Sequence, residues 1–406
     1  MLQVTGLDDA IRILMDAFGT FEPQGETLPV GGALGRTLRE DIAAGEDLPP
    51  YDRSTMDGFA VRAGDTFGAG ASMPAMLRIA GGVEMGEVVS SALEPGTAYR
   101  IPTGGMLPPG ADGVVMVEYT EEMDSDTVLI EKSISPGENV IRRGDDCRAG
   151  DRLYPKGHVL RAQDIGALAS LGIPDVGVQS LYRVGIISTG NEIVEPFGAV
   201  PPGKIRDVNT YALAAAAQRD GFTVHTYGIV PDDFEHLRET LASALAENDA
   251  VLLSGGSSVG VADMTLRVIA SMDESRLLVQ GIALKPGKPT IAASVGNKPV
   301  FGLPGHPVSA FIVYHTVILP VLYGILGKEK EIRVREAFFG ENYATQPGRD
   351  EYILVKLARQ GEKEFAHPVY AKSGMFLTIT AADGLVRVPA SREGIYENER
   401  VRVELF

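Results

Sequence analysis

The chain is poor in cysteine: Cys147 is the single cysteine among 406 residues. One cysteine excludes an intrachain disulfide and a CxxC metal knuckle, and it favours a reducing compartment. The six histidines do not pair at the four-residue spacing that places two rings on one face of a helix. We therefore expect no histidine-based zinc site.

Positive charge is also scarce. Lys and Arg number 37 against 54 Asp and Glu, so the formal net charge is −17 at pH 7. No dense basic block or basic-aromatic stripe offsets this field, which repels a phosphate backbone. We therefore expect no nucleic-acid binding.

Long uncharged apolar runs are missing as well. The longest candidate, 308–326, is interrupted by His315 and Pro320, so it predicts a buried helix and not a membrane span. The first fifteen residues carry two aspartates and an arginine and lack the features of a secretion signal. These observations predict a cytoplasmic protein without membrane association.

The residue composition and the hydrophobic pattern change several times along the chain. This is expected, because a chain of this length favours two to four domains. Apolar residues recur at helical spacing over 8–18, and again over 162–171, which predicts two amphipathic helices. Between them, 47–146 is rich in glycine and proline with short alternating apolar runs, which predicts a mostly β region.

A regular alternation follows. We predict strands at 183–188, 222–229, 249–254 and near 300–303, and helices at about 208–220, 233–246 and 263–272. This βαβα order predicts a parallel sheet covered by helices on both faces. After about residue 328 the pattern becomes β-like again, which is typical of a small all-β module.

Glycine and hydroxyl residues lie where two of the predicted strands end. The segment 188–192 follows the first strand and 254–260 follows the third. Ligands bind at the carboxyl ends of parallel strands, and helix N-termini offer N–H groups to anions, so both loops can cradle a phosphate. Neither loop is a GxGxxG fingerprint or a P-loop. Because glycine turns are common in such sheets, the binding interpretation depends on the two loops occurring together.

Charged residues accompany these loops. Lys285 and Lys288 lie three residues apart in KPGKP, which suits an oxyanion better than a solvated pair, although a plain surface turn is the alternative. Asp263 lies at an expected helix N-cap and Asp232 opens the preceding helix, where a purely structural role stays open. Glu192 lies inside the first glycine loop, where an acid repels phosphate unless a cation lies between them. Carboxylates together with phosphate predict magnesium.

Seven motifs, in order along nearly the whole chain, resemble those of the molybdopterin molybdenumtransferases. This is the MoeA family, which is related to the E domain of gephyrin. The motifs are Ser54–Arg62, Arg100–Gly104, Arg142–Asp146, Ser188–Glu192, Ser254–Gly260, Lys285–Pro289 and Leu303–Ser309.

The resemblance implies a multidomain α/β plus β fold. Residues 1–46 and 147–177 would form an elongated dimerisation domain, and 47–146 an inserted β domain. Residues 178–328 would form an α/β/α molybdopterin-binding domain with a mostly parallel sheet, and 329–406 a C-terminal β barrel. It also implies the reaction, in which molybdate is inserted at the dithiolene of adenylylated molybdopterin, AMP is released and Mg²⁺ assists.

The resemblance further implies roles for individual residues. The catalytic set is Asp57, Thr103, Asp146, Glu192, Asp232 and Asp263, of which Glu192, Asp232 and Asp263 would hold Mg²⁺. The residues for molybdopterin and AMP are Ser188, Gly190, Asn209, Ser254, Gly255, Gly256 and Pro304. The molybdate residues are Lys285, Lys288, Arg349 and Ser373.

Partners follow from the same resemblance. The inserted β domain, with its three catalytic residues, faces the other subunit in the family, so we expect a homodimer with a shared active site. A molybdopterin adenylyltransferase is the candidate partner that supplies the substrate.

Three residues depart from the family pattern. Asn191 stands where many members carry Asp, Gly281 where some place a lysine, and His306 where the LPGNPVS motif has Asn. They leave the contacts at the site and the choice of oxyanion open.

Two alternative functions remain. The first is insertion of tungstate, a dianion of nearly equal size. The second is a non-catalytic molybdopterin carrier or scaffold. The full carboxylate set favours catalysis, since a pure binding module gains nothing from burying acids near phosphate.

Overall fold

The computed structural model describes residues 4–255, 259–328, 332–370 and 372–406, with the backbone alone for 259–263. The chain forms two compact units. The smaller unit is Gln24–Ser180, and the larger unit combines Met1–Pro23 with Leu181–Phe406. Each is described by itself.

The smaller unit contains the predicted β region. Its main sheet has the strand order β7-β4-β6-β5-β9-β8, in which apolar side chains alternate toward a core around Phe59, Leu77 and Val128. The strands of this sheet are β4 (Gly58–Val61), β5 (Ala75–Gly82), β6 (Thr97–Ile101), β7 (Gly113–Met116), β8 (Thr120–Asp124) and β9 (Thr127–Ile130). The mostly β character of 47–146 is thus confirmed.

A second part of the smaller unit comes from both of its ends. Strand β1 (Gly25–Pro29) pairs antiparallel with β12 (Asp175–Gln179), and α2 (Ala162–Ser170) packs Leu168 into the same core as Val176. Helix α2 confirms the helix predicted at 162–171. The remaining short strands are β2 (Ile42–Ala43), β3 (Arg53–Ser54), β10 (Val140–Ile141) and β11 (Arg152–Tyr154).

The larger unit is built on a sheet of order β16-β13-β17-β21-β20-β18. Strand β13 runs parallel to β16 and β17, and β17 parallel to β21, whereas β20 and β18 add antiparallel pairs at one edge. The strands are β13 (Arg183–Thr189), β16 (Thr223–Val230), β17 (Ala250–Gly255), β18 (Ser275–Gln280), β20 (Ile291–Val295) and β21 (Lys298–Leu303). The mostly parallel sheet is confirmed, while the antiparallel edge was not predicted.

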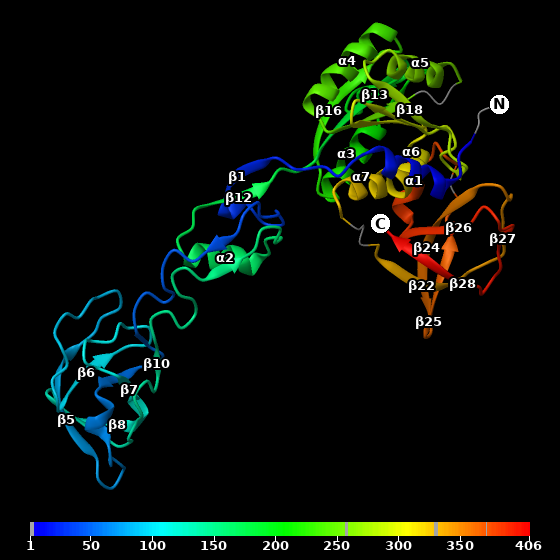
Figure 1. Ribbon diagram of the computed structural model, residues 1–406. Helices are drawn as coiled ribbons and strands as arrows, with labels where there is room; N and C mark the ends of the chain where they lie inside the picture. Colours follow the sequence, from blue (N-terminus) through cyan, green and yellow to red (C-terminus); the bar gives the residue numbers. More distant parts are fainter. Residues whose placement is uncertain (1–3, 256–258, 329–331, 371) are drawn as a thin grey trace. The chain divides into compact units, whose positions relative to one another are not determined.

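Helices cover both faces of this sheet (Figure 1). Along β17, Leu252 packs into the core of one face, and Val251 and Leu253 into that of the other. All three side chains are buried, which explains why this strand is a continuous run of apolar residues. The first face carries α1 (Leu7–Ala17), α3 (Asn209–Arg219), α6 (Pro307–Val313) and α7 (Leu319–Ile325); the second carries α4 (Phe234–Glu247) and α5 (Val259–Ala270).

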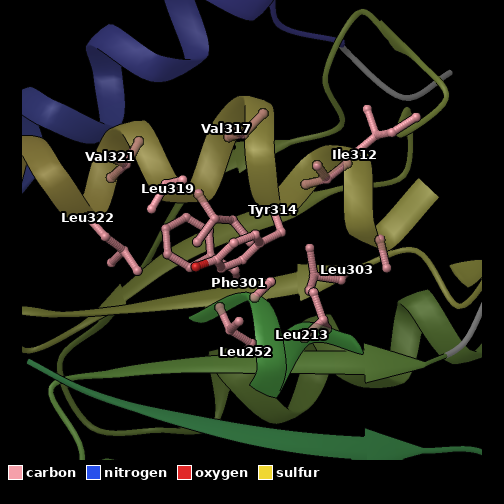
Figure 2. Packing of buried hydrophobic residues seen from close by; sticks show 14 of the residues in the cluster. Leu213, Leu252, Phe301, Leu303, Ile312, Tyr314, Val317, Leu319, Val321 and Leu322 are labelled. Carbon is pink, nitrogen blue, oxygen red and sulfur yellow. The ribbon is translucent and has the colours of Figure 1, made fainter. Parts of the chain in front are cut away.

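The predicted buried helix at 308–326 is confirmed. Tyr314 and Phe301 lie at the centre of the core that it covers (Figure 2). Within the described residues one helical run, 307–325, is long and apolar enough to cross a membrane, and 78% of its most apolar window is buried inside the structure. The π-helical turn η4 (Tyr314–Ile318) precedes Pro320, whose ring lacks the N–H of a regular helical hydrogen bond and clashes with the carbonyl four residues earlier.

The C-terminal segment forms the expected barrel. Strands pair in the ring β24-β25-β22-β28-β26, and β26 returns to β24, which closes a five-stranded barrel around Phe339, Val355 and Val403. The strands are β22 (Val334–Phe339), β24 (Asp350–Gln360), β25 (Lys363–Pro368), β26 (Gly384–Val388) and β28 (Arg400–Leu405), with β23 (Tyr343–Ala344), β27 (Gly394–Ile395) and the 3₁₀ turn η5 (Phe376–Ala381) beside them.

A short strand joins the barrel to the α/β part. β19 (Leu284–Lys285), the start of KPGKP, runs parallel to β24 and pairs Lys285 with Glu351. The two parts therefore share one compact unit, and the boundary predicted at 328 stays a prediction.

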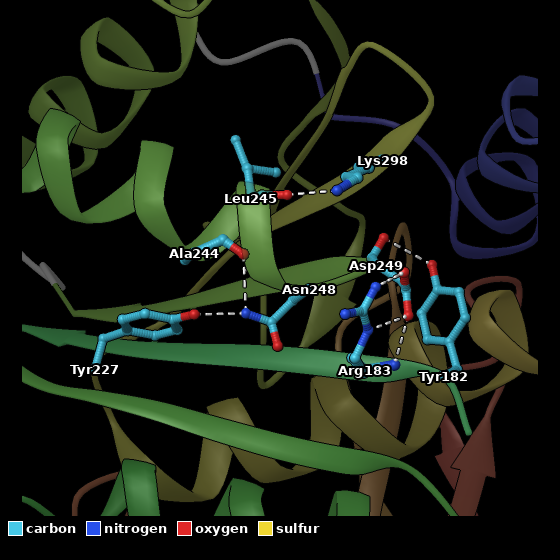
Figure 3. A network of polar contacts seen from close by, with 8 residues as sticks. All are labelled: Tyr182, Arg183, Tyr227, Ala244, Leu245, Asn248, Asp249 and Lys298. Atoms are coloured by element: carbon cyan, nitrogen blue, oxygen red, sulfur yellow. Dashed lines mark hydrogen bonds and ion pairs between the residues drawn. The ribbon is translucent and has the colours of Figure 1, made fainter. Parts of the chain in front are cut away.

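A polar network fixes the amino ends of the central strands (Figure 3). The Asp249 carboxylate accepts hydrogen bonds from the Arg183 backbone N–H at 2.8 Å and from its guanidinium at 3.1 and 3.3 Å. Tyr182 donates its hydroxyl to Asp249 O at 3.0 Å. These contacts hold β13 and β17 in register at the edge opposite the predicted loops.

Candidate functional site

The two predicted glycine loops begin side by side. The sheet register pairs Ser188 with Ser254 and Thr189 with Gly255. A Cβ placed on Gly255 would lie 2.1 Å from the Thr189 carbonyl oxygen, so only glycine permits this approach of the two strand ends. Gly256, predicted beside them, lies outside the described residues.

Asp232 locks the first loop to the loop after β16. Its Oδ1 accepts the Thr189 hydroxyl at 2.9 Å, and its Oδ2 accepts the Asn191 N–H at 3.2 Å. Asn191 Oδ1 in turn accepts the Asp232 N–H at 3.2 Å. Helix α4 is capped by Asp233, whose carboxylate accepts the His236 N–H at 3.0 Å. Asp232 therefore does not cap the helix, and its carboxylate is available to bind the loop. An aspartate at position 191 would place a second carboxylate beside Asp232, whereas Asn191 is neutral.

Asn209 ties the ends of two strands, β17 and β21, together. It is the first residue of α3 and 6% exposed, and its Nδ2 donates to Ser254 Oγ at 2.7 Å and to Gly305 O at 2.9 Å. Pro304, directly after β21, is buried at the same edge. The structure therefore brings the predicted residues Asn209, Ser254 and Pro304 together.

Ser188 lies near the end of β13, and Gly190 begins the turn that follows it. Ser188 is fully buried, and its hydroxyl has no hydrogen-bond partner within the described part of the chain. A Cβ on Gly190, whose φ is +154°, would lie 2.9 Å from Ile193 Cγ1 and 3.1 Å from Glu192 Oε2. Gly190 is needed for the tight turn that presents Glu192.

A cavity of about 550 Å³ opens along these loops. We call it the loop cavity. Of the predicted residues, Glu192, Asn209 and Gly255 line it. The other residues that line it include Lys204, Arg206, Asp207, Gly305, His306 and Gly374.

The basic side chains of the loop cavity were not predicted. Lys204 donates to Asn191 O, and Arg206 donates from Nε to Pro196 O at 2.8 Å. Both therefore brace the loops that surround the cavity. A signal was available in the sequence, since Lys204 and Arg206 lie within five residues of the predicted substrate residue Asn209.

The predicted metal set is incomplete in the structure. Glu192 is exposed in the loop cavity, whereas Asp232 is half-buried and is not among the residues that line it. Within the described residues, no three His, Cys, Asp or Glu side chains gather as a metal site. The side chain of Asp263 lies outside the described residues. Its backbone lies inside α5, which begins at Val259, so the prediction that Asp263 is the N-cap was wrong.

A second cavity, of about 390 Å³, lies between β19, α6 and the barrel. We call it the barrel cavity. Two of the four predicted oxyanion residues, Lys285 and Ser373, line it, together with Tyr343, Glu351 and Tyr370 among others. Lys288, which is exposed, and Arg349, which directly precedes β24, are not among its lining residues.

A hydrogen bond joins the walls of the two cavities. Ser373 Oγ lies 3.1 Å from His306 Nδ1, with Ser373 lining the barrel cavity and His306 the loop cavity. The Val308 N–H donates to Ser373 O at 3.2 Å and fixes the same segment. His306, a departure from the family pattern, thus contacts a predicted molybdate residue.

The departure from the family pattern at Gly281 also has a physical basis. Gly281 has φ +89°, in the left-handed region that favours glycine. Its carbonyl accepts the Thr5 N–H at 3.0 Å, and its N–H donates to Thr290 O at 2.8 Å. A lysine at this position would be strained.

The remaining predicted residues belong to the smaller unit. The Asp57 carboxylate accepts the Thr103 N–H at 2.6 Å, and this hydrogen bond holds the pKa of Asp57 below its usual value. The structure therefore brings Asp57 and Thr103 together. Asp146 lies exposed on a turn where its N–H donates to Leu48 O at 3.0 Å.

Comparison with known families covers most of the chain. Residues 5–172 match the family model of the MoeA N-terminal region, domains I and II. Residues 185–324 match the family model described as a probable molybdopterin binding domain. Residues 336–406 match the MoeA C-terminal region, domain IV.

Individual relatives agree. A protein of Methanocaldococcus jannaschii named as a putative molybdopterin biosynthesis protein is 35% identical over 92% of this chain and 90% of its own. Molybdopterin molybdenumtransferase 2 of Mycobacterium tuberculosis is 32% identical over 89% and 90%. The crystal structure of a molybdopterin biosynthesis MoeA protein from Pyrococcus horikoshii has a TM-score of 0.83 at 37% identity and covers 99% of both chains. With three family models matched in order and such full-length relatives, this chain belongs to the MoeA family of molybdopterin biosynthesis proteins.

Proposed function

We propose that the protein inserts molybdate into adenylylated molybdopterin and releases AMP, as a step of molybdenum cofactor biosynthesis. The observation that carries the proposal is the His306–Ser373 hydrogen bond, which joins the walls of the two cavities. One cavity lies at the carboxyl ends of parallel strands, where anions bind, and the other holds the ammonium group of Lys285. The relatives named molybdopterin molybdenumtransferase support the same reaction.

In this proposal the loop cavity binds the phosphate-bearing part of the substrate. The Gly255 backbone gives close access, and Lys204 and Arg206 add positive charge. The predicted substrate residues Ser188, Gly190, Asn209, Ser254, Gly255 and Pro304 lie at or next to this edge of the sheet. We retain them as the substrate-binding set, together with Gly256, which lies outside the described residues.

The carboxylates suit Mg²⁺, a hard cation that prefers oxygen ligands. Glu192, Asp232 and Asp263 would hold it. Each Asp232 oxygen accepts one hydrogen bond from the loop, which leaves acceptor capacity on both. When bound, Mg²⁺ would neutralise phosphate charge near Glu192. Independently of the metal, Asp232 would hold the first loop in place at the substrate through its two hydrogen bonds to that loop.

The barrel cavity binds the oxyanion in this proposal. The ammonium of Lys285 and the hydroxyl of Ser373 are donors that suit a tetrahedral dianion. Lys288 follows three residues after Lys285, and Arg349 lies two residues before Glu351. Both remain candidates for the same anion.

We also propose a homodimer in which Asp57, Thr103 and Asp146 complete the partner's active site. Asp57→Asn and Glu192→Gln variants should each be inactive. An equal mixture of the two should regain about a quarter of the wild-type rate, because about half of its dimers are mixed and each mixed dimer has one intact site of two. No recovery on mixing would contradict the shared site. A cytoplasmic location and supply of substrate by a molybdopterin adenylyltransferase belong to this proposal as well.

The reaction is tested by AMP release from purified protein given adenylylated molybdopterin and Mg²⁺, with molybdate, tungstate or neither. Release that requires molybdate is expected. An equal or stronger response to tungstate would favour the tungsten alternative, and tight binding without AMP under any condition would favour a carrier.

Single substitutions test which residues take part in the reaction. Asp232→Asn and Asp263→Asn should bind the pterin and lose AMP release, whereas Asp273→Asn, an exposed aspartate outside both cavities, should behave as wild type. Lys285→Ala combined with Lys288→Ala should raise the molybdate concentration needed for activity. An unchanged dependence would show that these lysines only shape a turn.

A further inference from the structure

Glu351 is a buried carboxylate in the wall of the barrel cavity. It is 3% exposed and is among the residues that line this cavity. The parallel register of β19 and β24 pairs it directly with Lys285. The ion pair measures 2.7 Å from Lys285 Nζ to Glu351 Oε1.

Two further donors hold this carboxylate in place. The Tyr343 hydroxyl donates to Oε1 at 2.9 Å, and the Thr345 hydroxyl donates to Oε2. Burial by itself would raise the pKa of Glu351, but the hydrogen bonds from Lys285, Thr345 and Tyr343 outweigh it and leave the pKa below its usual value. Glu351 is therefore ionised at neutral pH and fixed in one orientation.

Lys285 is the exposed member of the pair. Its side chain is 44% exposed against 4% for Glu351. An ammonium group has three N–H donors. Since Glu351 takes one of them from the buried side, the others remain for the cavity, where Ser373 also lies.

The carboxylate is not needed to dock the barrel. The backbone already joins the two parts, through the β19–β24 pairing and the Asp350 N–H, which donates to Ala283 O at 2.9 Å. A negative charge beside an anion site also weakens the attraction for the anion. The buried charge of Glu351 is therefore better explained by a role in orienting Lys285 than by a role in holding the barrel in place.

We propose that Glu351 is a positioning residue that orients the Lys285 ammonium toward the oxyanion in the barrel cavity. The inference rests on the proposed function, because it takes Lys285 as an oxyanion ligand. It adds a residue for which the sequence offered no signal, since the contact arises from the register of strands 66 residues apart.

A double-mutant cycle of Glu351→Gln and Lys285→Met tests this positioning role. The readouts are the KM for molybdate and the kcat of AMP release, and the Kd for adenylylated molybdopterin. Glu351→Gln should raise the KM about tenfold, the scale of a coupling of about 1.4 kcal/mol, with kcat and pterin Kd within about twofold of wild type. In the Lys285→Met background, Glu351→Gln should add no further loss.

The outcomes separate this inference from the proposed function. An unchanged or lower KM in Glu351→Gln, or effects of the two variants that simply add, would overturn the positioning role. If Lys285→Met itself left the KM unchanged, the oxyanion assignment of Lys285 would fail, and the positioning role with it.

Two variants guard against a folding artefact. Tyr343→Phe removes one donor to Glu351 and keeps the ring, so it should raise the KM by a smaller factor; an unchanged KM would count against the role even if Glu351→Gln did not fold. Glu364→Gln breaks an ion pair of the same barrel, with Arg335 at 2.8 Å, away from the cavity. It should leave the KM unchanged.

Discussion

Replacing Gly255 by alanine should destabilise the larger unit and open its candidate site. The added Cβ would meet the Thr189 carbonyl oxygen at 2.1 Å and Thr189 Cγ2 at 2.5 Å, whereas real Cβ contacts essentially never fall below 3.0 Å. The ends of β13 and β17 must therefore separate by about 0.9 Å. Overpacking of this kind costs about 1–3 kcal/mol.

Urea unfolding measures this loss, and titration with molybdopterin reports the opening of the loops. The matched control is Gly198→Ala, where a Cβ meets nothing within 4 Å, so its stability should stay within about 0.5 kcal/mol of wild type. If Gly255→Ala matched that control in both stability and pterin affinity, the close approach of the two strand ends would have no role in the site.

Three further predictions follow from particular contacts. Asn209→Asp should lower stability by about 1–3 kcal/mol in urea unfolding, because a carboxylate cannot donate to the Gly305 carbonyl; Asn209→Ser, which retains a donor, should lose less. The guanidinium of Arg161 holds the pKa of Asp164 far below its ordinary value of 3.8. Asp164→Asn should therefore lower the free energy of unfolding at pH values above 3.8, and this loss should shrink as the pH falls below 3.8. A loss that does not depend on pH would contradict this reasoning. Gly281→Lys should destabilise by about 1–2 kcal/mol, because its φ of +89° disfavours a side chain; a thermal midpoint equal to that of wild type would show that the turn adapts.

Much of the fold followed from local patterns. The strand-helix alternation from 183 to 254 appears in the structure as β13, α3, β16, α4 and β17 within one or two residues of the predicted bounds, because buried parallel strands are continuous apolar runs that periodicity detects. The antiparallel edge, β18 and β20, was missed. Its short segments carry no comparable signal, and their pairing is fixed only by the neighbouring strand β21.

The start of α5 was also misplaced. Asp263 was predicted as its N-cap since aspartate often occupies that position, but the helix begins four residues earlier, at Val259. Composition identifies a capping residue type, whereas tertiary contacts decide where the first turn forms.

The site could be predicted only in part. The glycine loops and Asp232 lie at strand ends, so topology alone brings them together. Glu351 and the contact of His306 with Ser373 depend on how the barrel packs against the α/β part. Such long-range packing leaves no periodic signal in the sequence.

The most direct test of the central claim measures AMP released and molybdenum bound to the pterin dithiolene in the same reaction, with purified protein, adenylylated molybdopterin, Mg²⁺ and molybdate. We predict that the two products form together in equal amounts, and that Asp232→Asn abolishes both. AMP release without bound molybdenum, or molybdenum insertion that proceeds at the wild-type rate in Asp232→Asn, would contradict the account.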